Sequence, residues 1–378
     1  MPHFDVVVCG LGITGSAALH ELACRGRRVA GIEQFIPGHD RGSSHGETRV
    51  IRLGYFEHPS YVPLVKRAHA KWREIGEAAG GRLLHVTGVL EIGPPESALV
   101  RGTLASIKTH ALPHEILAAG DLMQRFPAFR VPADFVAVLQ PDGGYLATEP
   151  SIHALLSLAH RAGAEIRGGE MIRAIEPRAD AVKIATDRAT IEADSAIVAV
   201  GPWLKALLPD LPAPIRITRQ VMAWFAPLDA ALVKPPRLPV YLIESRHGVH
   251  YGFPLRGHTL KVAKHHHADE AVDPQSFDRS VTAHDEGLIR AAIAEHLPAA
   301  NGALVDARTC LYTMTPDGDF IIDQLPGAPQ IVIASPCSGH GFKFAPAIGE
   351  ILADLATTGT TTHDISRFAL ARFGKMTT

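Results

Sequence analysis

The chain has 378 residues, of which 46% are hydrophobic and 20% are charged, and its formal net charge is −2 at pH 7. This composition is typical of a globular protein, and the length predicts two domains. A charge so close to neutral argues against nucleic acid as the main partner. No run approaches the roughly 18 apolar residues of a transmembrane helix.

The cysteines and the N-terminus bear on location. The four cysteines, Cys9, Cys24, Cys310 and Cys337, form no C-x-x-C pair, which suits a reducing compartment. The first apolar run carries Asp5 and lacks the basic region of a signal peptide. We therefore expect a cytoplasmic protein that does not associate with a membrane.

A strand, a glycine-rich turn and a helix open the chain. The apolar run 6–9 leads into Gly10, Gly12 and Gly15, which have G-x-G-x-x-G spacing, and a helical stretch follows. In this pattern the first glycine permits a tight turn and the second lets the backbone approach a pyrophosphate. The third glycine lets the helix pack closely on the strand. The pattern predicts a dinucleotide whose pyrophosphate lies at the positive end of the helix.

An acidic residue ends the second predicted strand, 29–32. Glu33 lies about 20 residues beyond the glycines, where a carboxylate accepts hydrogen bonds from an adenosine ribose. A carboxylate there disfavours a 2′-phosphate, so the ligand should be FAD or NAD rather than NADP.

A polar, glycine-rich loop over 37–46 follows this strand and should lie over the cofactor side of the sheet. Arg49 and Arg52 come next; spaced three apart, they would share one face of a helical turn. Two solvated surface arginines are the ordinary alternative, but with His45 they make a plausible anion-binding cluster. The segment 61–79 then predicts an amphipathic helix with an apolar stripe of Leu64, Ala68, Trp72 and Ile75.

The middle of the chain alternates between strand and helix patterns. Expected strands are 85–92, 137–145, 164–166, 182–185, 190–193, 196–203 and several within 215–264; expected helices are 99–110, 121–126, 152–162 and 285–296. The helix 152–162 should bury Leu155, Leu156, Leu158 and Ala159. The apolar strand 196–203 has the profile of a buried parallel strand, whereas 215–264 suits an antiparallel sheet. We expect no metal at His265, His266 and His267, because consecutive residues point in different directions.

The last third repeats the strand, turn and helix order. The strand 308–315 should direct Cys310 and Tyr312 to the same face. A buried strand over 331–334 leads through the glycine-rich turn 338–344 into a helix over 345–355. Lys343 at that helix start opposes the helix dipole, which indicates an anionic ligand nearby.

These segments together resemble the monomeric sarcosine oxidase family, which includes N-methyltryptophan oxidase and pipecolate oxidase. The matching pieces keep their order along the chain and are 10–15, 42–49 with Arg52, 251–254, 260–261, 310–313, 320–323 and 338–343. The resemblance implies an α/β fold with α+β elements: a Rossmann-type FAD-binding domain, discontinuous in sequence, and an interleaved substrate domain on an antiparallel sheet. We assign 1–82, 146–212 and 310–378 to the FAD-binding domain, and 83–145 and 213–309 to the substrate domain.

The resemblance also implies roles for single residues. Cys310 matches the cysteine that is bonded covalently to the flavin; a small buried hydrophobic residue is the ordinary alternative. Arg52 and Lys343 match the pair that binds the substrate carboxylate, and Lys261 matches the lysine that assists oxygen reduction.

The expected catalytic set also contains Tyr251 and His265, which match residues lining the substrate pocket. It is completed by His45 and Arg49, which match residues that supply cationic charge beside the flavin. The residues expected to bind the cofactor are Gly10, Gly12, Ile13, Thr14, Gly15, Glu33, Gln34, Ser43, Ser44, His45, Arg49, Ile172, Gly201, Trp203, Cys310, Tyr312, Gly339, His340, Gly341, Phe342 and Lys343.

Some positions depart from the family pattern. Cys337 stands before the Ser-Gly-His motif where a Phe, Met or Leu is usual, and the segment 265–273 differs among members. These departures leave the substrate open.

The implied function is an FAD-dependent oxidase of secondary amino acids, such as sarcosine, other N-methyl amino acids, or cyclic ones such as pipecolate and proline. It oxidises the C–N bond to an imine and reduces O2 to H2O2. No residue is assigned as an active-site base. The alternatives are an amino acid dehydrogenase that uses another acceptor, or a non-catalytic FAD-binding subunit. We expect a monomer whose partners are a small secondary amino acid and O2.

Overall fold

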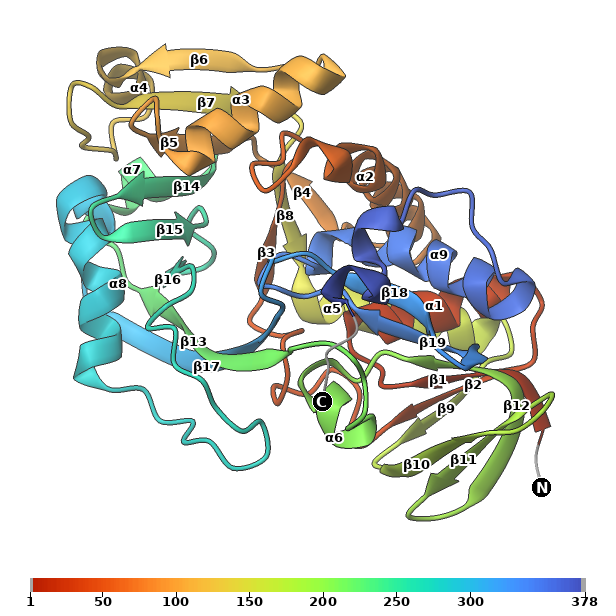
Figure 1. Ribbon diagram of the computed structural model, residues 1–378. Helices are drawn as coiled ribbons and strands as arrows, with labels where there is room; N and C mark the ends of the chain where they lie inside the picture. The colour runs from red at the N-terminus through yellow and green to blue at the C-terminus, as the bar shows by residue number, and fades with distance from the viewer. Residues whose placement is uncertain (1–2, 375–378) are drawn as a thin grey trace.

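The computed structural model describes residues 3–374 of the chain. Figure 1 shows two lobes, one built on a largely parallel sheet with helices on it and one built on a largely antiparallel sheet. The expected α/β fold class with α+β elements is confirmed.

The first sheet has eight strands, and its core is the path β10-β11-β12-β1-β2-β9. Strand β1 lies between β2 and β12 and runs parallel to both. The bounds are β1 His3–Cys9, β2 Val29–Glu33, β9 Glu165–Gly168, β10 Ile172–Pro177, β11 Val182–Thr186, β12 Thr190–Val198, β18 Ile321–Leu325 and β19 Ala328–Ser335. The sheet thus draws strands from three separate parts of the sequence.

Strand β12 differs from its sequence prediction. The segments 190–193 and 196–203 were expected as separate strands, but one strand runs from Thr190 to Val198. Its first half pairs antiparallel with β11 and its second half pairs parallel with β19. Burial alternates at the start of β12 and is continuous at its end, which explains why the sequence pattern changes within one strand.

Helices cover this sheet on the side where α1 (Ile13–Cys24) packs between α5 (Thr148–Arg161) and α9 (Ala345–Thr358). Helix α2 (Val62–Ala78) packs against α9, and its predicted apolar stripe is buried. In α5 the prediction was wrong only for Leu158, which is half-buried. The short helix α6 (Leu204–Leu207) follows β12.

The second sheet also has eight strands, in the order β17-β13-β16-β15-β14-β5-β7-β6. All its pairs are antiparallel except β14 with β5. The bounds are β5 Val89–Gly93, β6 Glu115–Ala118, β7 Val136–Gln140, β13 Arg216–Phe225, β14 Val240–Ser245, β15 Gly248–Gly252, β16 Leu260–Lys264 and β17 Leu304–Met314, with helices α3 Ala98–His110, α4 Ala119–Arg125, α7 Ala230–Val233 and α8 Ala283–His296.

A three-stranded sheet, β3-β8-β4, stands between the lobes. It consists of β3 Thr48–Ile51, β8 Gly144–Ala147 and β4 Leu84–Val86. The single strand expected over 85–92 is therefore two strands, and they belong to different sheets. The chain turns between them at Gly88, whose φ of +76° favours glycine.

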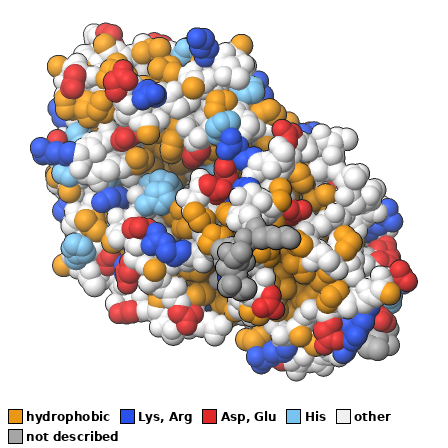
Figure 2. Space-filling model, viewed as in Figure 1, with side chains coloured by type: hydrophobic (Ala, Val, Ile, Leu, Met, Phe, Trp, Pro, Cys, Tyr) orange, Lys and Arg blue, Asp and Glu red, His pale blue; other side chains and the backbone are white. Residues whose placement is uncertain are grey.

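The domain assignment stays a prediction, and the boundary placed at residue 310 falls inside β17, which pairs with β13 along its length. Figure 2 shows acidic and basic side chains interspersed over the visible face, in keeping with the small net charge. Within residues 3–374, no helix combines the length and the apolar character needed to cross a bilayer.

Candidate functional site

The turn between β1 and α1 has the close backbone approaches that its glycines predict. Gly10 has a φ of +88°, and a Cβ on it would lie 2.7 Å from the carbonyl oxygen of Ala199. A Cβ on Gly15 would lie 1.8 Å from the carbonyl oxygen of Gly10, so the helix can approach the strand only without a side chain there. Helix α1 has no side-chain cap and no acid in its first turn, which leaves its positive end open to an anion.

Glu33 is buried at the end of β2, where it fixes the neighbouring backbone. Its carboxylate accepts hydrogen bonds from the amides of Leu11 (2.8 Å) and Phe35 (3.1 Å), and His39 Nε2 lies 3.4 Å away. Burial raises the pKa of Glu33, but the hydrogen bonds from His39 and Leu11 outweigh it, so the pKa lies below its usual value. The carboxylate is therefore ionised at the edge of the cavity.

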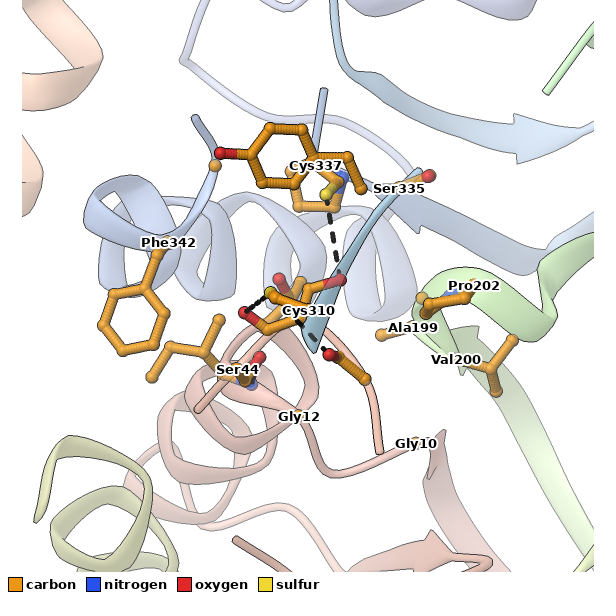
Figure 3. A pocket seen from close by; sticks show the side chains of 18 of the residues that line it. Gly10, Gly12, Ser44, Ala199, Val200, Pro202, Cys310, Ser335, Cys337 and Phe342 are labelled. Carbon is orange, nitrogen blue, oxygen red and sulfur yellow. Dashed lines mark hydrogen bonds between the residues drawn. The ribbon is translucent and has the colours of Figure 1, made fainter. Parts of the chain in front are cut away.

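One large cavity brings together nearly all of the predicted site residues. Figure 3 shows Gly10, Gly12, Ser44, Cys310, Ser335 and Phe342 reaching it from separate segments. The predicted residues that line it are Gly10, Gly12, Ile13, Thr14, Glu33, Gln34, Ser43, Ser44, Arg49, Arg52, Ile172, Gly201, Trp203, Tyr251, His265, Cys310, Tyr312, Gly339, His340, Gly341, Phe342 and Lys343. Three predicted residues, Gly15, His45 and Lys261, lie outside its lining.

Cys310 lies on β17 with its sulfur buried and facing this cavity (Figure 3). Its Sγ is 3.7 Å from Arg49 Nη2 and 3.9 Å from the carbonyl oxygen of Ser43. Burial raises the pKa of the Cys310 thiol, and Arg49 acts in the opposite direction. Tyr312 lines the same cavity, so the prediction that these two side chains share a face of the strand is confirmed.

Arg49 and Arg52 do not share a helical face, and that prediction was wrong. Arg49 is in strand β3 and donates to the carbonyl oxygens of Thr48 (3.0 Å) and Ser43 (2.9 Å). Arg52 follows the strand and points to other partners, yet both arginines line the cavity.

His45 is buried, and neither of its ring nitrogens has a hydrogen-bond partner within residues 3–374. Burial and then Arg49 lower the pKa of His45 to about 3, so the ring is neutral at pH 7. The expectation that His45 adds cationic charge is therefore corrected: at this end of the site the charge comes from Arg49.

Lys261 is buried on β16 beside the cavity rather than in its lining. Its Nζ donates to the carbonyl oxygens of Gly46 (2.7 Å) and Thr48, and it lies 4.5 Å from the centre of the Phe253 ring. Burial, followed by the charge of Arg49, lowers the pKa of Lys261 well below its ordinary value. An anion developing nearby would favour its charged form.

Arg52 is 3% exposed and lies between two aromatic rings, with its guanidinium carbon 4.2 Å from the centre of Tyr55 and 4.4 Å from that of Phe56. Its Nη2 donates to both carboxylate oxygens of Glu57, at 2.7 and 2.6 Å. Its Nε lies 3.4 Å from Oε1 of Glu91. The guanidinium is thus held on two sides by carboxylates.

Lys343 is 5% exposed and reaches the same end of the cavity from the turn before α9. Its Nζ donates to the carbonyl oxygen of His340 (2.7 Å) and lies 3.5 Å from the Tyr55 hydroxyl. In the described part of the chain no carboxylate forms an ion pair with it. Burial and then Arg52 lower the pKa of Lys343 to about 7.

His340 and His265 are both neutral but have different surroundings. The ring of His340 is held by the Tyr55 hydroxyl at Nδ1 (2.6 Å) and the Gly318 carbonyl oxygen at Nε2 (3.0 Å). His265 Nδ1 lies 3.4 Å from the Tyr312 hydroxyl, and burial lowers its pKa well below the ordinary value. Together with Tyr251, His265 and Tyr312 form a polar wall of the cavity next to Cys310.

Two site residues escaped the sequence reasoning, Glu57 and Glu91. Glu57 lies in the loop just after Arg52, where an acid close to an arginine was a visible signal. Glu91 is an acid in the middle of the apolar strand β5 and is fully buried. A charged residue in such a run indicates a buried partner.

The residues present fit an FAD. The glycine turn and the uncapped start of α1 suit a pyrophosphate, and Glu33 suits an adenosine ribose. Arg49, which lines the cavity beside Cys310, gives the opposite end a cation that a ligand can contact. The residues that would hold the cofactor thus extend along the whole cavity.

Comparison with known proteins agrees with this reading. The family model described as FAD dependent oxidoreductase matches residues 5–355. A monomeric sarcosine oxidase from Streptomyces avermitilis is 40% identical over 373 residues, covering 97% of each chain. An N-methyl-L-tryptophan oxidase from Yersinia pestis is 35% identical and covers 98% of this chain and 99% of its own length. Among solved structures, NikD, an unusual amino acid oxidase essential for nikkomycin biosynthesis, aligns with a TM-score of 0.86 and 28% identity over 98% of each chain.

Proposed function

This chain belongs to the FAD dependent oxidoreductase family, and we propose that it oxidises the C–N bond of secondary amino acids with O2 as the electron acceptor. Two of its relatives are named as oxidases of sarcosine and of N-methyl-L-tryptophan. Both of these compounds carry a carboxylate and a secondary amine, so a site for this class must hold an anion next to the reacting nitrogen.

One observation carries the proposal: Arg52 and Lys343 meet at one end of the cavity although they come from opposite ends of the chain. Arg52 is paired with Glu57 and Glu91, whereas Lys343 forms no ion pair among the described residues, so an anion bound between the two cations would supply the missing counter-charge. Arg52 can offer two N–H groups to a carboxylate, while Lys343 acts as a point charge. The aligned amides at the start of α9 favour the same anion.

In the proposed complex these cations hold the substrate carboxylate, and the wall of Tyr251, His265 and Tyr312 surrounds the amine. When bound, FAD supplies the two-electron acceptor for the C–N bond. The nearby positive charges favour the neutral form of the amine, which is the form that can be oxidised. Oxidation leaves an imine on the substrate, which water hydrolyses unless it is cyclic. No described side chain has the surroundings of a strong base, and none is assigned.

Oxygen reduction is assigned to the neighbourhood of Lys261. Negative charge develops on O2 as it is reduced, and a preorganised cation in a buried site stabilises such charge more than water does. Phe253 and the carbonyl oxygens of Gly46 and Thr48 hold the Lys261 side chain in one place.

We also propose that the flavin is bonded covalently to Cys310, which lies in the cavity lining beside Arg49. Acid-precipitated wild-type protein should stay yellow, and Cys310→Ala should release its flavin into the supernatant. Cys337→Ala is the matched control, because Cys337 lines the same cavity and should leave attachment unchanged. Release of all flavin from the wild type would show that the bond is absent.

The test of the proposed activity is a peroxide-coupled screen over N-methyl amino acids, proline and pipecolate, each paired with its amide. Acids should give H2O2 and the amides should be poor substrates. Substrate turnover with an artificial acceptor but without H2O2 would favour a dehydrogenase instead. The expected monomer can be checked on the same preparation by light scattering.

A further inference from the structure

The inner side of Arg52 is held by a buried carboxylate whose role the proposed function does not explain. Glu91 is 0% exposed and comes from β5, in a different sheet from the strand that leads to Arg52. Its Oε1 has no hydrogen-bond partner in the described structure and lies 3.4 Å from Arg52 Nε. A buried carboxylate oxygen without a hydrogen bond is costly, so its place beside Arg52 needs a reason.

The other oxygen of Glu91 is fixed by Gln140. The Gln140 amide nitrogen donates to Glu91 Oε2 at 2.5 Å, and its carbonyl oxygen accepts from the amides of Leu53 (3.0 Å) and Gly54 (2.6 Å). Every polar atom of Gln140 is therefore engaged, which fixes the direction in which its amide points. Gln140 ties Glu91 to the backbone that immediately follows Arg52.

Arg52 is thus restrained on three sides. Tyr55 and Phe56 confine its plane, Glu91 faces its Nε edge, and its Nη1 donates to the carbonyl oxygen of Gly54 at 3.3 Å. The nitrogen Nη2 remains directed to Glu57, which is 20% exposed, whereas Glu91 is not exposed at all. The inner carboxylate is fixed, and the outer one borders the cavity.

We propose that Glu91 is a positioning residue that holds the Nε edge of Arg52, so that Nη2, which contacts Glu57 at the border of the cavity, is presented to a ligand carboxylate. This rests on the proposed function, because it presumes that Arg52 binds the substrate. Glu91 itself touches neither the substrate nor the cofactor in this scheme.

The chemistry of the contact explains why an acid is needed at this position. The Gln140 amide nitrogen and Arg52 Nε are both donors, and a carboxylate can accept from both of them as well as from the Thr103 hydroxyl. In Glu91→Gln either orientation of the new amide sets one N–H group against another donor. The variant keeps the size of the side chain but makes one of these two contacts repulsive. Because Gln140 is fixed by its own hydrogen bonds, we expect the repulsive contact to be the one with Arg52.

The test measures binding of methylthioacetate and of its uncharged amide to the holoenzyme by calorimetry. Glu91→Gln should raise the Kd of methylthioacetate about tenfold, the effect of one unsatisfied buried donor. The Kd of the amide should change by less than about threefold, because it does not use the charge of Arg52. A purely structural role would lower the melting temperature and shift both constants equally.

The double variant Glu91→Gln/Gln140→Glu supplies the rescue. The carboxylate at position 140 can accept from the amides of Leu53 and Gly54 and from the new amide at position 91, but it loses the hydrogen bond that Gln140 donates to the carbonyl oxygen of Gly54 (3.1 Å). The amide oxygen at position 91 then faces Arg52 Nε. The double variant should bind methylthioacetate more tightly than Glu91→Gln does, since the acceptor and the charge beside Arg52 are both restored, while the lost contact to Gly54 lowers the melting temperature. A double variant as weak as Glu91→Gln would overturn the inference.

Arg52→Met separates this inference from the proposed function. If Arg52→Met raises the Kd of methylthioacetate and Glu91→Gln does not, Glu91 has no positioning role, but the proposed carboxylate site is supported. If Arg52→Met changes nothing, the carboxylate site itself is wrong. In the Arg52→Met background, adding Glu91→Gln should have little further effect, because the two residues act through one contact.

Discussion

Two clusters of charged side chains in this protein differ in how their charges are balanced. The helix cluster lies where α1, α2 and α9 meet and consists of Glu21, Arg25, Arg67, Lys71, Glu350 and Asp354. The pocket cluster lies at the end of the cavity and consists of Arg52, Glu57, Glu91 and Lys343. The two clusters are built from the same kinds of residue, so the difference between them is one of arrangement.

In the helix cluster each charge has a partner on another helix. Lys71 lies 2.7 Å from Glu21 and 3.5 Å from Glu350, and Arg67 pairs with Glu350 at 2.6 Å. The hydrogen bonds from Arg67 lower the pKa of Glu350 to about 2, against the effect of burial. These charges stabilise one another, and the cluster fastens helices together.

In the pocket cluster the charges are arranged at a cost. Lys343 has no ion-pair partner among the described residues, and burial lowers its pKa to about 7. Burial also raises the pKa of Glu91 to about 7. A buried cation whose pKa is lowered by burial does not stabilise the fold, so the pocket cluster indicates a ligand. The charges of the helix cluster are thus all paired, whereas in the pocket cluster Arg52 is paired and Lys343, among the described residues, is not.

Removing a cation of the pocket cluster is the strongest test of whether this cluster serves binding rather than stability. Arg52→Met and Lys343→Met should each reduce the binding free energy of methylthioacetate by about 2–4 kcal/mol, because the remaining charges lose their partner. This corresponds to an increase in Kd of about 30- to 1,000-fold. Calorimetry on the holoenzymes measures it. The melting temperature should hardly fall in Lys343→Met, whereas it should fall in Arg52→Met, because that change leaves Glu91 buried without its counter-charge. An unchanged Kd in both variants would mean that the carboxylate binds elsewhere.

Lys261 is another buried cation that forms no ion pair among the described residues, and its substitution tests whether it takes part in the reaction. Lys261→Met should slow reoxidation by O2 about a hundredfold, because losing one preorganised charge typically removes about 3 kcal/mol of transition-state stabilisation. Reduction by substrate should be affected much less, because Lys261 lies outside the cavity lining. Stopped-flow measurement of the two half-reactions separates the effects, and equal slowing of both would argue against the role.

The helix cluster should respond in stability rather than in binding. Glu350→Gln should lower the free energy of unfolding by about 2 kcal/mol at pH 7, while substrate affinity stays unchanged. Glu176→Gln is the control, since its pair with Arg178 at 2.6 Å is exposed and should contribute little.

The sign of the pH dependence follows from the lowered pKa of Glu350. Its contribution is complete above the unfolded value of 4.5 and is lost as the pH falls toward about 2. The difference in unfolding free energy between wild type and Glu350→Gln, measured in urea, should therefore shrink over this interval. A difference that does not depend on pH would rule out the ion pairs as its source.

The smallest effect concerns the pH dependence of binding. Lys343 becomes neutral above its pKa of about 7, and an anion binds better to the charged form. The affinity for methylthioacetate should therefore fall by up to about tenfold per pH unit above pH 7. The pKa of Glu91 is also about 7, so Glu91 can contribute to the same pH dependence. The contribution of Lys343 is therefore measured as the difference between the slopes of wild type and Lys343→Met. An identical slope in the variant would show that Lys343 does not titrate with binding.

The sequence by itself determined the cofactor site, because its parts are local. The glycine spacing, the strand before it and Glu33 after it occupy adjacent positions, and their geometry is set by backbone sterics over a few residues. The alternation that directs Cys310 and Tyr312 to one face of β17 is equally local. Resemblance to a known family then extended these local patterns to Arg52, Lys261 and Lys343.

Only the tertiary structure decided which strands pair and how the charges of these residues are compensated. The sequence could not show that β12 is one strand that pairs with β1, β11 and β19, because pairing depends on which strands the fold brings alongside. It could not show that His45 is neutral, since burial fixes its pKa. Nor could it place Glu91, 39 positions beyond Arg52 in number and 3.4 Å away in space, because that contact joins two sheets. Charge balance is a property of neighbours in space, and neighbours in sequence do not determine it.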